Sequence, residues 1–331
     1  MKKVIITGPN WYGNIVENCQ EGFNKNSIKS YIIKFRPLHY FEGGFTLYNF
    51  IKYLFHKLYS ICFNIKFILI SLFIKPDLIF IIKGEVILKI SLLLIKKIRI
   101  KITVWWQDDP FKYKNLLDLY KIYDKFFIFD MSYSEELVKH NVKDVTWLPF
   151  AFNKSLLPVP AKSNKTKDFD IIFAGFASDE RIAFFENIAK LGFKIKLIGN
   201  SWKKSKLLND KATLLPDISP EEIFKHYGNA KIGININHKQ SITGVNCRTF
   251  ELCGFGVFQL TDFRKDLINL YNIGEEVVVY ENMEDLTNKV IYYIKNDAER
   301  EKIANAGMAR TIRDHTYQSR MKYVIEILDL N

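Results

Sequence analysis

An arginine and a glutamate stand three residues apart where a helix is predicted to begin. Arg248 and Glu251 open the stretch RTFELCGFG, inside the polar and glycine-bearing segment 231–262. A spacing of three places both side chains on one face of a helix, so both can face one ligand. The amino end of a helix with a nearby guanidinium suits a diphosphate, and a carboxylate one turn later suits the two hydroxyls of a ribose.

The spacing of Arg248 and Glu251 also has a purely structural interpretation. An arginine and a glutamate at this spacing also form an ion pair on a helix surface, which stabilises a helix by roughly a few tenths of a kcal/mol. The spacing alone does not choose between the two interpretations.

Two adjacent carboxylates form a second candidate group. Asp108 and Asp109 follow the apolar run that ends in Trp105 and Trp106, in the segment WWQDDP. A carboxylate at the end of a buried strand could remove a proton from a hydroxyl, and neighbouring charge or indole rings would raise its pKa. Alternatively, Asp109 and Pro110 simply begin the next helix.

A glycine-bearing loop, GPNWYGN, follows the first predicted strand. It lacks the GxGxxG spacing of a dinucleotide site, so NAD binding is not expected. The loop either turns the chain or contributes to the acceptor side of a site. Its candidate residues are Gly8, Asn10, Trp11, Tyr12 and Gly13.

No metal or cofactor is expected. Two adjacent aspartates without further ligands make a poor metal site, and the four cysteines lack zinc-site spacing. Cys19, Cys62, Cys247 and Cys253 are therefore expected as reduced thiols. His238 and His315 are interpreted as structural.

Alternating strand and helix patterns surround these residues in both halves of the chain. Strands are predicted in the first half at the runs VIIT, SYIIKF, PDLIFIIKG, RIKITVWWQ, DKFFIFD and DVTWLPF. A polar stretch with two prolines at 157–168 is the expected linker. The alternation then resumes with FDIIFAG, FKIKLIGN and AKIGININ. We expect an α/β chain with two Rossmann-like, doubly wound parallel-sheet domains that face a ligand-binding cleft.

Composition fits two globular domains with a basic surface. The 331 residues carry a formal net charge of +12, and 48% of them are hydrophobic. That charge favours phosphorylated substrates, anionic membranes or nucleic acid, although compositional drift alone would also produce it. The first residues do not resemble a secretory signal, so a cytoplasmic location is expected.

The segment 45–74 is apolar, aromatic and interrupted by lysines. Because it lacks a charge-free run of about 18 residues, we expect that it does not span a membrane. It reads either as core helices of the first domain or as a surface that meets anionic lipid, as in a membrane-associated enzyme. The second interpretation is favoured because Lys52, Lys57 and Lys66 alternate with Phe and Tyr.

The second half resembles a known family. RTFELCGFGVFQLTD, GEEVVVYENMEDLTNKVIYYI and HTYQSR, preceded by IIFAGFASDER, LIGNSW and GVNCR, occur in order across 170–320. Together they resemble the C-terminal domain of CgeB-like glycosyltransferases of the group-1 superfamily, which implies the GT-B architecture. Thr243 stands where many retaining relatives carry an acidic residue, so the stereochemical outcome stays open.

The resemblance implies roles for individual residues. Glu251 would hold the donor ribose, while Arg248 and the amides near Thr249 would hold the diphosphate. Asn246 is included in this donor-binding set, and Gly244 would present backbone amides to the sugar or phosphate. Residues implied to line the nucleotide pocket are Gly175, Arg181, Gly199 and Asn200.

The predicted function is transfer of a sugar from a nucleotide diphosphate sugar, UDP in the first instance, without a metal. The acceptor would be a glycan, lipid-linked glycan or protein in cell-surface polysaccharide or glycoconjugate synthesis, with Asp108 or Asp109 as base and Arg248 stabilising the leaving group. Predicted domains are 1–157 on the acceptor side, 165–312 for the donor, and a helix in 313–331 that packs back on the first domain. The alternatives are a nucleotide-sugar epimerase and a non-catalytic module that binds membrane or nucleic acid; nucleic acid is not the expected partner.

Overall fold

The chain folds into two α/β units. The computed structural model describes residues 1–10, 14–36, 47–157 and 167–330. Unit 1 comprises Met1–Pro149 and Tyr317–Asn331, and unit 2 comprises Phe150–Thr316. The division thus falls at 149 and 316, where the sequence had suggested 157 and 312.

Unit 1 is built on a six-stranded parallel sheet of order β2-β1-β3-β4-β5-β6. Its strands are β1 (Lys3–Pro9), β2 (Lys29–Phe35), β3 (Leu78–Ile82), β4 (Lys101–Trp106), β5 (Lys125–Ile128) and β6 (Val145–Trp147). β3 (LIFII), β5 (KFFI) and nearly all of β4 (KITVWW) are buried. Continuous burial is typical of central strands in a parallel sheet that is covered on both faces.

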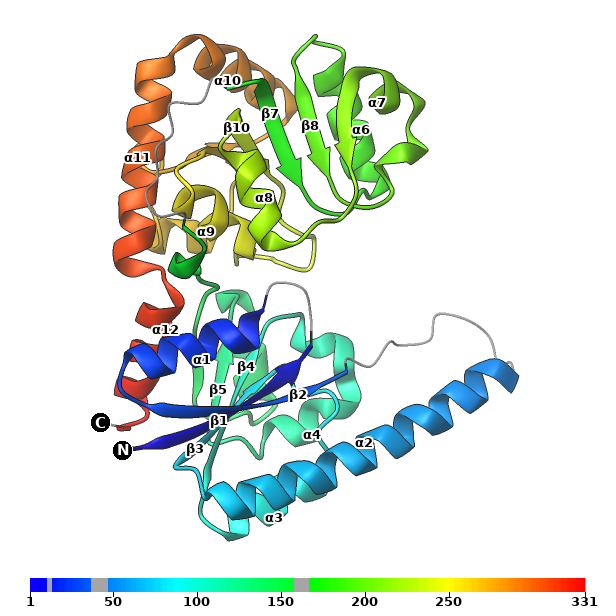
Figure 1. Ribbon diagram of the computed structural model, residues 1–331, viewed down its shortest axis with the longest axis vertical. Coiled ribbons are helices and arrows are strands. Elements are labelled where there is room, and N and C mark those ends of the chain that lie inside the picture. Colours follow the sequence, from blue (N-terminus) through cyan, green and yellow to red (C-terminus); the bar gives the residue numbers. More distant parts are fainter. Residues whose placement is uncertain (11–13, 37–46, 158–166, 331) are drawn as a thin grey trace. The chain divides into compact units, whose positions relative to one another are not determined.

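Helices cover both faces of this sheet. They are α1 (Ile15–Lys25), α2 (Leu47–Ile74), α3 (Lys89–Lys97), α4 (Leu117–Tyr120), α5 (Ser134–Lys139) and α12 (Tyr317–Ile327), with short 3₁₀ turns at Pro110–Leu116 and Met131–Tyr133. α1 and α12 lie on the opposite side of the sheet from α2 and α3 (Figure 1). Gly22 permits the close α1–α12 packing, because a Cβ there would approach the Tyr317 carbonyl oxygen to 2.7 Å.

Unit 2 repeats the architecture with the order β12-β11-β10-β7-β8-β9. Its strands are β7 (Phe169–Ala174), β8 (Ile195–Ile198), β9 (Ala212–Leu215), β10 (Ala230–Asn235), β11 (Phe258–Asp262) and β12 (Val278–Tyr280), and all of them are parallel. The strand order reverses between β7 and β10, which is where ligands bind in open α/β sheets.

Two hydrophobic clusters fill the two faces of the unit 2 sheet. The helices are α6 (Asp179–Ala189), α7 (Lys206–Lys211), α8 (Pro220–Tyr227), α9 (Cys247–Gly254), α10 (Met283–Lys295) and α11 (Asp297–Asp314), with 3₁₀ turns at Lys154–Leu156, Trp202–Lys204 and Lys265–Asn269. Ile223 of α8 and Leu252 of α9 belong to one cluster, while Phe185 of α6 and Val290 of α10 belong to the other. The predicted fold class, two doubly wound parallel sheets, is confirmed.

Helix α2 is longer and more exposed than a core helix. Ile51–Ile74 is long and apolar enough to cross a membrane, with a mean hydropathy of 1.7, and only 22% of its most apolar window is buried. The sequence had argued against a span from the lysines within this segment, and it left a core role open. Most of α2 therefore lies outside the core, whereas Phe63 and Phe67 in its carboxyl-terminal half are buried in it.

Replacing Gly199 with alanine is expected to destabilise unit 2 by about 3 kcal/mol. Gly199 has φ +136°, and a Cβ there would collide with the carbonyl oxygen of Gly175. Gly192→Ala is the matched control, because Gly192 also has positive φ (+80°) but nothing lies within 4 Å of its Cβ position. Urea denaturation of the three proteins should show a clearly larger loss for Gly199→Ala, and equal losses would contradict the backbone contact.

Candidate functional site

The amino end of α9 is fixed by a network of asparagine side chains. Asn246 is the N-cap residue, and its Oδ1 accepts a hydrogen bond from the Thr249 amide at 3.3 Å. Its Nδ2 donates to Asn235 Oδ1 at 2.9 Å, and its backbone amide donates to Asn237 Oδ1 at 2.8 Å. Asn235 and Asn237 stand at and just beyond the carboxyl end of β10. The network therefore ties the start of α9 to the edge of the sheet.

This network gives the predicted residues Asn246 and Thr249 internal partners. The Thr249 side chain is fully buried, and its Oγ1 accepts from Asn235 Nδ2 at 2.9 Å. Asn246 and Thr249 thus position the helix start, whatever ligand it receives. Gly244 lies buried in the preceding loop, beside Thr243, whose carbonyl accepts from the Asp266 amide at 3.0 Å.

Arg248 in the first turn of α9 forms an ion pair with Glu251, three residues further along the helix. Arg248 Nη1 donates to Glu251 Oε2 and, at 3.3 Å, to the hydroxyl of Tyr227. Both charged side chains remain about a quarter exposed, at 26% and 23%. Burial opposes the charge of Arg248, but Glu251 together with Tyr227 and Cys247 outweighs burial and raises the arginine pKa. The helix start therefore presents a permanent cation and an acceptor oxygen at partly accessible positions.

Gly175, Gly199 and Asn200 lie at the carboxyl ends of β7 and β8. The Gly175 amide donates to the Ile198 carbonyl at 2.8 Å, and the Gly175 carbonyl accepts from the Trp202 indole at 3.0 Å. The Asn200 carbonyl accepts from the Ala177 amide at 3.2 Å, and its side chain is exposed. The two glycines let these loops approach closely, and Asn200 is left at the open rim.

Arg181 connects the loop after β7 with the loop after β10, where the strand order of the sheet reverses. Its guanidinium donates to the carbonyls of Phe176 and Ile236, each at 3.0 Å, and burial lowers its pKa. The position borders a cavity of about 480 Å³. The cavity is lined by Phe176, Ser178, Glu180, Arg181, Phe184, Ile236, Asn237, His238 and Lys239. A cavity at a switch point has the position expected of a nucleotide pocket.

In unit 1, Asp108 and Asp109 have different environments. Asp109 Oδ1 accepts from the Phe111 amide at 2.8 Å and so begins the 3₁₀ turn at Pro110. Asp108 Oδ2 accepts from Lys83 Nζ at 3.3 Å, in a pair whose side chains are 6% exposed for the lysine and 18% for the aspartate. Asp109 thus has the helix-start role that the sequence allowed, and Asp108 is the better candidate base.

The first loop of unit 1 is only partly described. Gly8 ends up within β1, where a Cβ would approach Val16 and Ile82 to 2.8 and 2.9 Å, so this glycine serves close packing. Asn10 is exposed, and its amide donates to the Phe35 carbonyl at 2.8 Å. The predicted acceptor residues Trp11, Tyr12 and Gly13 lie outside the described residues.

His315 and the buried cysteines have structural surroundings, whereas His238 lines the candidate pocket. His315 is buried with Nε2 2.7 Å from the Leu270 carbonyl oxygen, and His238 borders the cavity described above. Cys19 and Cys253 are buried, and all four cysteines are free thiols. Within the described ranges, no three His, Cys, Asp or Glu side chains cluster as a metal site would require.

Comparisons with known proteins place this geometry in a family context. Residues 181–326 match a family model described as "Glycosyl transferase-like". The spore protein CgeB of Bacillus subtilis (strain 168) is 23% identical over 261 residues, which cover 73% of this chain and 80% of that protein. Sucrose-phosphate synthase from Thermosynechococcus elongatus shares the fold with a TM-score of 0.70 and 12% identity, covering 100% of this chain and 99% of that one. Anabaena HepE in complex with UDP-glucose does so with a TM-score of 0.66 and 10% identity, covering 100% of both chains.

The chain resembles CgeB along most of its length and has a GT-B fold. The predicted resemblance is therefore confirmed. The segment that the family model matches begins at Arg181 and contains Arg248 and Glu251. The likeness to the two solved structures, at 12% and 10% identity, concerns the fold.

Sequence reasoning missed several polar residues of this chain. In unit 2 these are Asn235, Asn237 and Asp262, whose Oδ1 accepts from the Asn237 side chain at 2.9 Å. In unit 1 they are Lys83 and Glu85, in the loop after β3. The usable signal was positional, because each residue ends a buried strand or follows one closely, at the sheet edge where ligands bind.

Glu85 is a buried carboxylate with an unsatisfied oxygen. The residue is 8% exposed, and within the described part of the chain its Oε2 has no hydrogen-bond partner. Burial raises its pKa above 4.5, while the charge of Lys83 opposes the shift. The native state therefore holds the proton of Glu85 more tightly than the unfolded chain does.

Stability should consequently fall as Glu85 ionises. A raised native pKa means that the contribution of Glu85 to stability is fully present below pH 4.5 and is lost as pH rises through the native pKa. Glu85→Gln removes this decline, so the variant should gain stability relative to the parent protein between pH 4.5 and neutrality. Urea denaturation at both ends of that range measures the difference, and a difference that does not change with pH would contradict the assignment.

Proposed function

We propose that the chain is a glycosyltransferase that moves a sugar from a UDP-sugar to a hydroxyl of a glycan or lipid-linked acceptor. The observation that carries the proposal is the partly exposed Arg248–Glu251 pair near the amino end of α9, inside the segment that matches a glycosyl transferase-like family. UDP is proposed as the nucleotide because HepE, which shares the fold, was solved with UDP-glucose.

Donor binding is assigned to the carboxyl edge of the unit 2 sheet. Glu251 would accept hydrogen bonds from the two ribose hydroxyls, since an ionised carboxylate has two acceptor oxygens. Arg248 and the positive end of α9 would hold the diphosphate. The ion pair between the two side chains keeps both charges in place before the donor arrives.

The transfer step needs a base and a stabilised leaving group. The acceptor oxygen attacks the anomeric carbon, the bond from that carbon to the diphosphate oxygen breaks, and the bonding electrons leave with the diphosphate. Arg248 would stabilise the charge that develops there, and Asp108 of unit 1 would take the hydroxyl proton. We propose that these protein groups act without a metal ion, because a guanidinium can supply the charge that a cation would otherwise supply.

A panel of UDP-sugars, with and without sugar or lipid-linked acceptors, tests the proposal. Acceptor-dependent release of UDP from one of the donors is the expected result. Sugar product formed from donor alone would instead identify an epimerase. Salt-dependent binding of nucleic acid without any nucleotide-sugar binding would identify a non-catalytic module.

A further inference from the structure

Helices α2 and α3 expose a large apolar surface on unit 1. The α2–α3 face is defined by side chains that are at least 41% exposed. On α2 these are Tyr48, Ile51, Tyr53, Leu54, Phe55, Leu58, Ile61, Ile65, Leu69, Leu72 and Phe73, and on α3 they are Ile90, Leu93 and Leu94. Scattered single apolar residues are normal on a protein surface, but a contiguous apolar patch marks an interaction site.

The opposite side of α2 is fixed to the rest of unit 1. Phe63 and Phe67 are buried, and Phe63 packs edge-on against Phe35 of β2. Asn64 donates to the Val86 carbonyl and accepts from the Leu88 amide, both at 2.9 Å. These polar bonds hold α2 to the segment that leads into α3, so the two helices present one face.

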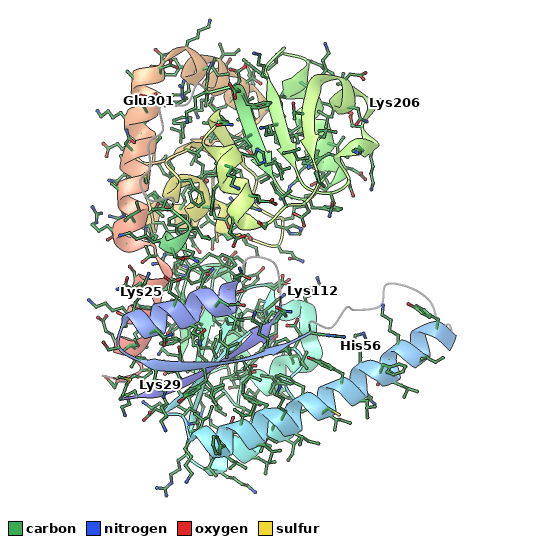
Figure 2. The ribbon with its side chains drawn as sticks, in the orientation of Figure 1. Lys25, Lys29, His56, Lys112, Lys206 and Glu301 are labelled. Atoms are coloured by element: carbon green, nitrogen blue, oxygen red, sulfur yellow. The ribbon has the colours of Figure 1, made fainter. Side chains whose placement is uncertain are left out.

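The amino-terminal half of α2 extends beyond this anchor. Every described side chain from Ile51 to Cys62 is exposed or half-exposed. Figure 1 shows this end of α2 projecting away from the sheet of unit 1, and Figure 2 shows side chains leaving it on several sides around His56. A helix that stood free in water would not retain so many exposed aromatic and aliphatic groups without a partner.

The charges of the face select the partner. Neither α2 nor α3 contains an aspartate or a glutamate, whereas α2 carries Lys52, Lys57 and Lys66, and α3 carries Lys89 and Lys97. The third lysine of α3, Lys96, pairs with Asp124 of unit 1 at 2.8 Å and is not part of the face. Apolar side chains interleaved with lysines suit a lipid surface with anionic headgroups. A second copy of the chain fits less well, because it would set lysines against lysines, and interface cores are depleted in lysine.

Crossing the bilayer is incompatible with the contacts of α2. A spanning helix would have to take Lys66, which lies well inside its apolar stretch, into hydrocarbon, and this is unfavourable by about 3 kcal/mol. It would also have to break the Asn64 bonds and expose the pocket that holds Phe63 and Phe67. The nine residues of α3 are too short to span.

We propose that the α2–α3 face docks unit 1 onto an anionic lipid bilayer, with the helices lying along the interface. The apolar side chains enter the boundary between headgroups and acyl chains, and the lysines meet the headgroup phosphates. This docking extends the proposed function, because it brings the enzyme to lipid-linked acceptors. It can nevertheless be measured whether or not the chain transfers sugar.

Sedimentation of the full-length protein with vesicles tests the docking. The protein should bind phosphatidylcholine vesicles that contain about a third phosphatidylglycerol, bind pure phosphatidylcholine weakly, and lose affinity with added salt. Phe55→Ser with Leu58→Ser should weaken binding about tenfold or more, because both exposed side chains leave the membrane boundary. Lys57→Ser and Lys66→Ser should each weaken it about fivefold.

Two control variants show whether the loss of vesicle binding is specific to the α2–α3 face. Val138→Ser and Leu191→Ser, which alter exposed apolar side chains elsewhere, should bind like the parent protein. Circular dichroism should show all variants folded. The proposal is overturned if the parent protein ignores anionic vesicles, if the Phe55 and Leu58 variant binds undiminished, or if bound protein resists alkaline carbonate as a spanning protein does. A dimer that depends on Phe55 and Leu58 without vesicle binding would overturn it in favour of a second copy.

Discussion

Replacing Arg248 with alanine is expected to lower kcat/KM for sugar transfer by about 10²–10³-fold. The guanidinium lies in the first turn of α9, and its pKa is raised by Glu251 even against burial, so it is charged at every working pH. Removing it deprives the departing diphosphate of its main fixed cation. Steady-state kinetics with the identified UDP-sugar measures the loss.

Two further variants distinguish the loss of the Arg248 guanidinium from a general loss of stability. Arg248→Lys keeps the charge but loses the planar two-pronged donor, so it should recover only part of the activity. Arg310→Ala removes an arginine of similar exposure, paired with Asp314 on α11, and should leave kcat/KM near the parent value. Equal losses in Arg248→Ala and Arg310→Ala would mean that general destabilisation, and not leaving-group stabilisation, explains the effect.

Asp108→Asn should lower kcat by about 10²–10⁴-fold, because the amide cannot accept the acceptor proton. Asp109→Asn should have little effect, since an asparagine oxygen can still accept the Phe111 amide hydrogen. The contrast follows from their partners, as only Asp108 faces Lys83.

The loss of charge at position 108 also leaves Lys83 without its carboxylate, and Lys83 is buried. Unfolding and kinetics should therefore be measured together. If Asp108 is the base, the acid limb of the kcat/KM profile of the parent protein should disappear in Asp108→Asn. A variant that retains this limb at reduced rate would show that Asp108 only positions other groups.

The sheets were predictable because their strands are continuous apolar runs. LIFII at 78–82 and IIFA at 171–174 are buried along their whole length, so pattern alone located them. The start of α9 was predictable for a similar local reason, since Asn246, Arg248 and Glu251 are neighbours in the chain. The contacts that these three side chains make could not be predicted from the local sequence.

Long-range polar contacts escaped prediction because strand order decides them. Asn237 and Asp262 are 25 residues apart in sequence. Their side chains meet because β10 and β11 are adjacent in the sheet. Glu85 is buried because Lys83 and Gly84 both adopt positive φ, 63° and 81°, and redirect the chain after β3. The exposure of α2 was invisible for a related reason, because an apolar run does not reveal which of its sides the rest of the protein covers.

The role of Glu251 is tested most directly by calorimetric titration of UDP into the parent protein and into Glu251→Gln. Glutamine keeps the size of the side chain and can still accept from Arg248, so the fold should persist. Asp285→Asn, which alters a similarly exposed pair with Lys289 on α10, serves as the control. We predict that Glu251→Gln weakens UDP binding roughly 10-fold to 100-fold while the control binds normally. An unchanged dissociation constant in Glu251→Gln would contradict the assignment of the ribose to the start of α9.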